Sequence, residues 1–219
     1  MHFSAIASLL LGASCALAVP VEERAAACPT GITAAEASRV QRSFREDGVV
    51  PTLIPSITPQ VAVKITYPTV NMDLGTVTTT LQTVSPPTFF FSARRGARAG
   101  ATYSLFLVDT DVPGPNGPPV LGSPRINFLH WYVSGIKPCA STGTTTTIYE
   151  PPTPASPQEQ HRYTWLVYEE PVGYKPNLIQ AQVRPAFDLG GYVRRGQLGE
   201  PIGGNFMNQS ITNGVLPPA

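Results

Sequence analysis

Charged residues are scarce in this chain. Only 13% of the 219 residues are Asp, Glu, Lys or Arg, and the formal net charge at pH 7 is +1. A protein that binds nucleic acid through charge carries a clear excess of Lys and Arg. The composition therefore predicts no nucleic acid partner, while the 42% of hydrophobic residues predicts one globular domain rather than a disordered chain.

Cysteine and histidine are also few, with three residues of each. Their spacing fits no zinc motif, and neither His-x-His nor His-Glu-x-x-His occurs. Gly-x-Ser-x-Gly, the turn that presents a serine nucleophile, is also missing. We therefore expect no metal, no cofactor and no catalytic residue. The residue types leave one alternative, in which His130, His161 and Asp109 form a two-histidine, one-carboxylate metal site.

The N-terminal apolar run, residues 5–17, is too short to span a membrane comfortably. It ends in Ala16-Leu17-Ala18, an Ala-x-Ala cleavage pattern. We predict a signal peptide over residues 1–18 and a secreted, extracellular protein with no integral membrane segment after cleavage. A membrane anchor and a cytosolic helix are the alternatives. Residues 19–30 are expected to be a pro-segment or a flexible N-terminus, and residues 31–219 a single domain.

Cleavage of the predicted signal peptide removes Cys15, so two cysteines remain. In an oxidising compartment an even pair favours a disulfide, here between Cys28 and Cys139. Two unrelated thiols are the alternative. Asn208-Gln209-Ser210 is the only acceptor sequence for N-glycosylation, so Asn208 is a candidate glycosylation site.

The 24 prolines and 19 glycines predict many turns, as a β-rich domain requires. Thr33 and Glu36 form a capping-box pattern that predicts a helix over residues 32–47. A second helix is expected over residues 187–195, and Pro51–Pro59 is expected to be extended. We predict about seven strands, including residues 61–67, 88–91, 103–108, 128–133 and 161–168.

Three strand-like runs carry ionisable side chains in apolar or aromatic surroundings. Asp109 continues the face of the first run that holds Leu105 and Leu107. Period 2 also predicts that His130 shares a face with Phe128 and Tyr132, opposite Leu129, Trp131 and Val133. By the same rule His161 shares a face with Tyr163, Trp165 and Val167. These runs indicate a small polar pocket, although both histidines could instead be hydrogen-bonded structural residues.

Four motifs in this order resemble the phosphatidylethanolamine-binding protein family. Val108–Pro113 is similar to its Asp-Pro-Asp-x-Pro box, and His130–Val133 is similar to its His-Trp/Phe-Leu-Val strand. Pro152–Pro154 followed by His161–Tyr163 resembles its proline-rich segment before His-Arg-Tyr. Leu198–Met207 is similar to its C-terminal Leu-Gly-x-Pro-Val segment.

The resemblance implies a β-rich sandwich of two sheets with peripheral helices. It also implies a non-catalytic protein that binds a small anion in a pocket: phosphate, phosphoethanolamine or a phospholipid head group. The family includes inhibitors of serine carboxypeptidases, so a protease inhibitor or protein-interaction module is the alternative, with a serine protease as partner. The family's pocket positions correspond here to Asp109, His130, His161, Tyr163, Pro113 and Met207.

The loop before His161 departs from the family's glycine-rich pattern. Pro151, Pro157 and Glu159 occupy the matching glycine positions. Proline has no backbone N–H to offer an anion, and Glu159 adds a negative charge where phosphate would lie. Asp111, in the first box, is expected to cap the turn after its strand rather than to contact a ligand.

Overall fold

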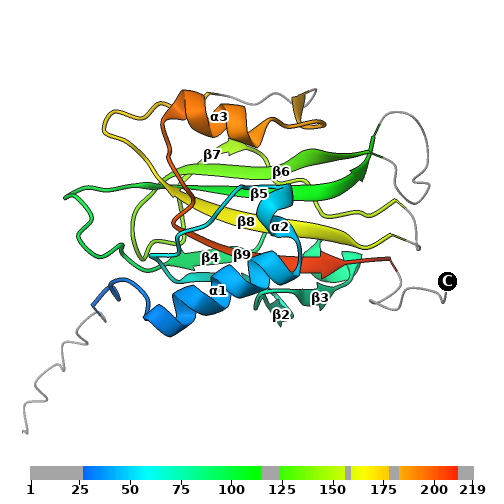
Figure 1. Ribbon diagram of the computed structural model, residues 1–219, viewed down its shortest axis with the longest axis horizontal. Helices are drawn as coiled ribbons and strands as arrows, with labels where there is room; N and C mark the ends of the chain where they lie inside the picture. The colour runs from blue at the N-terminus through cyan, green and yellow to red at the C-terminus, as the bar shows by residue number, and fades with distance from the viewer. Residues whose placement is uncertain (1–26, 115–123, 156–158, 178–182, 212–219) are drawn as a thin grey trace, which may run out of the picture.

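The computed structural model describes residues 27–114, 124–155, 159–177 and 183–211. Within them the chain forms two β-sheets, as predicted (Figure 1). The larger sheet has the strand order β3-β9-β8-β5-β6-β7 and the smaller one β2-β1-β4. The strands are β1 (Val63–Tyr67), β2 (Val70–Asn71), β3 (Thr76–Thr78), β4 (Thr88–Phe91), β5 (Tyr103–Pro113), β6 (Arg125–Ile136), β7 (Thr144–Thr147), β8 (His161–Glu169) and β9 (Gly203–Gln209).

The described residues thus form nine strands where the sequence predicts about seven. β2 and β3 are only two and three residues long, too short for an alternating pattern to be recognised. Each is held by its neighbour instead, because β2 pairs with β1 and β3 runs parallel to β9.

The helices are α1 (Ala34–Glu46), α2 (Val49–Thr52) and α3 (Leu189–Gly196), with a 3₁₀ turn, η1 (Thr80–Thr83). The predicted capping box of α1 is present: Thr33 Oγ1 accepts from Glu36 N, and Glu36 Oε2 accepts from Thr33 N. The sequence predicts an extended chain over Pro51–Pro59. This prediction is wrong for Pro51 and Thr52, which are the last two residues of α2. Leu53 N donates to the Val49 carbonyl in this turn, and Val49 and Ile54 are both buried.

Two apolar clusters lie on opposite faces of the larger sheet. Phe106 and Val108 of β5 pack with the helices, whereas Leu105 and Leu107 pack with the smaller sheet. These four side chains are fully buried, and burying each contributes about 1.5–3 kcal/mol. The predicted alternation in β5 is therefore confirmed, and it requires a layer on each side of the sheet.

β6 does not follow the predicted alternation. Trp131 lies opposite Leu107 and Leu129 lies opposite Val108, so a register shift falls at His130. Leu129 consequently joins the cluster under the helices, together with Tyr132, while Trp131 stays in the cluster between the sheets. Period 2 fails because a β-bulge inserts one extra residue on this strand.

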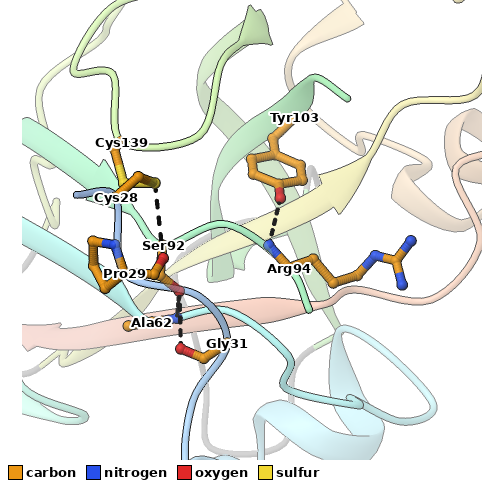
Figure 2. The surroundings of a disulfide bond; sticks show 8 residues. All are labelled: Cys28, Pro29, Gly31, Ala62, Ser92, Arg94, Tyr103 and Cys139. Atoms are coloured by element: carbon orange, nitrogen blue, oxygen red, sulfur yellow. Dashed lines mark hydrogen bonds between the residues drawn. A yellow bond between two sulfur atoms is a disulfide. The ribbon is translucent and has the colours of Figure 1, made fainter. Parts of the chain in front are cut away.

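A disulfide joins Cys28 to Cys139, which is the predicted pair (Figure 2). Closing a loop of 111 residues stabilises the fold by about 4–5 kcal/mol. Hydrogen bonds hold the segment after Cys28 in place, since Ser92 Oγ donates to the Gly31 carbonyl and accepts from Ala62 N. The N-terminal segment is thereby fixed to the sheets.

Arg94, in the loop before β5, is held by contacts with other residues rather than being a freely solvated side chain. Its guanidinium pairs with Glu169. Its backbone N–H donates to the Tyr103 hydroxyl (Figure 2). Arg98 donates to the carbonyl of Glu170. In the described residues, no helix is both long and apolar enough to cross a membrane. The predicted signal peptide, residues 1–18, lies outside the described residues.

Candidate functional site

Asp109, His130, His161 and Tyr163 come together from three adjacent strands. Asp109 lies near the end of the buried part of β5, and it pairs in register with Tyr163 of β8. The Nδ1 atom of His161 lies 2.7 Å from Asp109 Oδ2, and the Nε2 atom of His130 lies 3.9 Å from the same oxygen. All four residues are at least 95% buried. The sequence thus predicted the members of this cluster.

His161 is buried between two carboxylates, those of Asp109 and Glu159. Burial alone would lower its pKa, but the hydrogen bond and charge of Asp109, followed by those of Glu159, outweigh burial and raise the pKa. Its Nε2 atom lies 3.3 Å from Glu159 Oε2. Both ring nitrogens therefore donate to carboxylates of the protein itself.

His130 has the opposite character. Burial lowers its pKa more than the charge of Asp109 raises it, so the neutral ring is favoured at pH 7. Its Nδ1 atom donates to the carbonyl oxygen of Glu150 at 2.8 Å. This bond places the proton on Nδ1 and leaves the Nε2 lone pair facing the cluster.

Asp109 is the centre of the cluster because two donors converge on its carboxylate. Asp111 N donates to Oδ1 at 2.8 Å, and His161 donates to Oδ2. Burial and the neighbouring carboxylate raise the pKa of Tyr163 far above its ordinary value, so the phenol stays protonated. A buried carboxylate needs such donors to remain charged.

Asp111 does not cap a turn, contrary to the sequence-based expectation. It forms a two-pronged ion pair with Arg162, with both N–O distances 2.8 Å, and it also accepts from Arg162 N. Burial would raise the pKa of Asp111, but the bonds from Arg162 outweigh this and lower it. Arg162 also donates to the Asp47 carbonyl, so it ties β5 and β8 to the end of α1. Sequence reasoning missed this role of Arg162.

Met207 and Pro113 are the other two residues that the sequence predicts to line the pocket. Met207 is fully buried and pairs in register with Tyr163 across β8 and β9. Pro113 lies four residues beyond Asp109, opposite Arg125.

Asn208, the predicted glycosylation site, is half-buried in β9, and its amide donates to Asp47 Oδ1. A glycan would replace that bond, and modification of Asn208 stays a prediction.

The metal alternative gains no support from the geometry. In residues 27–114, 124–155, 159–177 and 183–211, no three His, Cys, Asp or Glu side chains are arranged to hold an ion. A cavity of about 460 Å³ lies elsewhere, between α1 and the strands β1 and β2. The ion pair between Arg39 and Asp73 stands beside it, and the Asn205 amide there already donates to the Met72 carbonyl.

The comparisons with known proteins agree with the motifs. The family model described as phosphatidylethanolamine-binding protein matches residues 69–216, more than half of the chain. The chain therefore belongs to the phosphatidylethanolamine-binding protein family, as the sequence motifs predicted.

Two curated relatives are similar in sequence. A 26 kDa secreted antigen of Toxocara canis is 31% identical over 170 residues, which is 74% of this chain and 61% of the antigen. CEN-like protein 1 of Nicotiana tabacum is 30% identical over 110 residues, which is 49% of this chain and 58% of that protein. The chain thus spans about three fifths of the length of these relatives.

Two solved structures share the fold at 20% sequence identity. A carboxypeptidase Y inhibitor, in complex with its cognate proteinase, has a TM-score of 0.66, with 80% of this chain and 96% of that chain covered. A phosphatidylethanolamine-binding protein from Plasmodium vivax has a TM-score of 0.64, with 77% and 96% covered. At this identity the likeness shows the two-sheet fold alone.

Proposed function

We propose that this protein is a non-catalytic binding protein whose site at His130 and His161 takes a small anion. The ligand class is phosphate, phosphoethanolamine or a phospholipid head group. The observation that carries the proposal is the buried His161, which is fixed by Asp109 beside a second imidazole and whose pKa is raised by its carboxylate neighbours. A fixed cation in a site with little water attracts an anion far more strongly than an exposed one does.

A non-catalytic role fits the way the imidazoles are used. In the part of the chain that the structure describes, neither histidine hydrogen-bonds a Ser, Thr or Cys side chain. A histidine that activates a nucleophile needs that contact. Both rings are instead held in place by oxygens of Glu150, Asp109 and Glu159, as in a site that binds rather than reacts.

The experiment is a titration of the folded protein with phosphoethanolamine, followed through the imidazole NMR signals. We expect the signals of both His130 and His161 to shift at millimolar ligand. His161→Ala should weaken binding by about 1–3 kcal/mol, the contribution of one hydrogen bond to a charged group. His130→Ala should weaken binding mainly at low pH, because Nε2 of His130 can donate to an anion only when the ring is protonated. An absence of any response in folded protein would assign both histidines a purely structural role.

The proposal includes export from the cell and a single domain over residues 31–219. The Cys28–Cys139 disulfide supports export, because such bonds persist in oxidising compartments. The relative from Toxocara canis is described as secreted. Residues 1–18 are proposed to be a cleaved signal peptide, and residues 19–30 a pro-segment or flexible N-terminus.

Inhibition of a serine protease is the second candidate function. It is favoured by the likeness in fold to a carboxypeptidase Y inhibitor solved with its proteinase. Fold alone does not give function, so this candidate depends on an inhibition assay against a serine carboxypeptidase.

A further inference from the structure

Glu159 occupies the place beside His161 where an anionic ligand would bind. Its side chain is only 4% exposed, although a lone carboxylate favours water strongly. Oε2 lies 3.3 Å from His161 Nε2, and Oε1 lies 3.4 Å from Arg125 Nη1. Two cationic groups, from β8 and β6, thus converge on one carboxylate of the protein itself.

The contact blocks the only nitrogen of His161 that a ligand could use. The Nδ1 atom is committed to Asp109, so an anion can reach the ring only through Nε2. A phosphate at Nε2 would displace Glu159 or stand next to its negative charge. At separations of about 4 Å, two like charges near a protein surface repel by several kcal/mol, so displacement is favoured.

Displacement of Glu159 would also release Arg125. The Arg125 side chain is 37% exposed, and its Nη1 atom donates both to Glu159 and to the carbonyl of Asp111. Once Glu159 has moved away, this guanidinium has donors left for a phosphate group. The two partners of Glu159 are therefore also the two groups that would hold a ligand anion.

We propose that Glu159 is a built-in competitor, a carboxylate of the chain that fills the anion subsite formed by His161 and Arg125. Only a ligand that displaces Glu159 gains this subsite, so the residue sets the affinity and selectivity of the pocket. This inference rests on the proposed function, since it requires an anion to bind at His161. It adds Arg125 to the ligand-binding residues.

The test compares phosphate and phosphoethanolamine binding by wild-type protein and Glu159→Gln at pH 7, by calorimetry. Gln keeps the size of the side chain but removes its charge. We expect Glu159→Gln to bind at least about tenfold more tightly, since a repelling charge has been removed. Arg125→Ala in the Glu159→Gln background should weaken that binding again. Glu46→Gln is the matched control, because it removes one exposed negative charge at the end of α1.

The outcomes separate the two proposals. Equal binding by wild-type protein and Glu159→Gln would overturn the competitor role and leave the anion site standing. Binding by Glu159→Gln alone would support the competitor role but contradict anion binding by the native protein at neutral pH. If neither binds, both proposals fail.

A measurement on the wild-type protein covers the case in which the variant does not fold. Saturating phosphate should shift the ¹³C signal of the Glu159 side-chain carboxyl, because this group loses His161 and Arg125 as partners. The Glu46 carboxyl signal should stay in place. Bound phosphate that leaves the Glu159 signal unchanged would overturn the inference.

Discussion

The Nδ1 atom of His161 lies 2.7 Å from Asp109 Oδ2, in an ion pair buried where β8 runs beside β5. The two residues are 52 positions apart in the sequence. A charge this deep in the fold persists only because its counter-charge is equally deep. The pair therefore links the stability of the sheet to the protonation of the site.

Replacing Asp109 with Asn tests the contribution of this pair. We expect the free energy of unfolding to fall by about 1.5–3 kcal/mol, because the charged hydrogen bond to His161 is weakened. Chemical denaturation at pH 6 measures the loss. Asp73→Asn is the control, since its ion pair with Arg39 is exposed and should contribute only about 0–1 kcal/mol. Equal losses in the two variants would contradict a special role for Asp109.

The two histidines should affect stability with opposite pH dependence. The pKa of His161 is raised in the folded state, so its contribution is complete below the ordinary value of about 6.5 and is lost as pH rises through the folded pKa. The pKa of His130 is lowered, so its contribution is complete above about pH 6.5 and is lost as pH falls.

Denaturation at a series of pH values separates the two contributions. His161→Gln should remove the loss of stability on the alkaline side, and His130→Gln should remove the loss on the acidic side. The comparison uses how the free energy of unfolding changes with pH rather than its absolute value, because both substitutions also remove packing contacts. If the stability of the two variants depends on pH in the same way, the opposite pKa shifts assigned to His130 and His161 are wrong.

The disulfide should account for a large part of the stability of the protein. Cys28→Ser combined with Cys139→Ser is expected to lower the free energy of unfolding by about 4–5 kcal/mol, given the 111-residue loop.

Intact and non-reducing peptide mass spectrometry of exported protein should show a chain that begins at or after Val19 and a linked Cys28–Cys139 pair. Retention of residues 1–18, or free thiols at both positions, would contradict the processing scheme.

Protease inhibition, if present, should depend on the pocket. We expect sub-micromolar protein to slow a serine carboxypeptidase, and His130→Ala or His161→Ala to relieve the inhibition. Glu46→Gln should leave inhibition intact. Strong inhibition that persists in both histidine variants would assign that function to an outer surface, and the pocket would not explain it.

Local patterns in the sequence were sufficient for much of the fold. The capping box of Thr33 and Glu36 depends on residues three positions apart, so it could be recognised without any tertiary contact. The alternation in β5 required only that both faces of a strand be buried. The motifs around Asp109, His130 and His161 likewise identified the residues that the structure brings together.

The tertiary structure alone decided how those residues interact. The bulge at His130 depends on the register against β5, which the period of two cannot reveal. The pairing of Asp111 with Arg162 joins positions 51 residues apart. Glu159 was recognised in the sequence as a charge near the site, but its contact with Arg125 of β6 was not. Such contacts follow from strand order and depth of burial, which no local pattern encodes, because long-range packing fixes them.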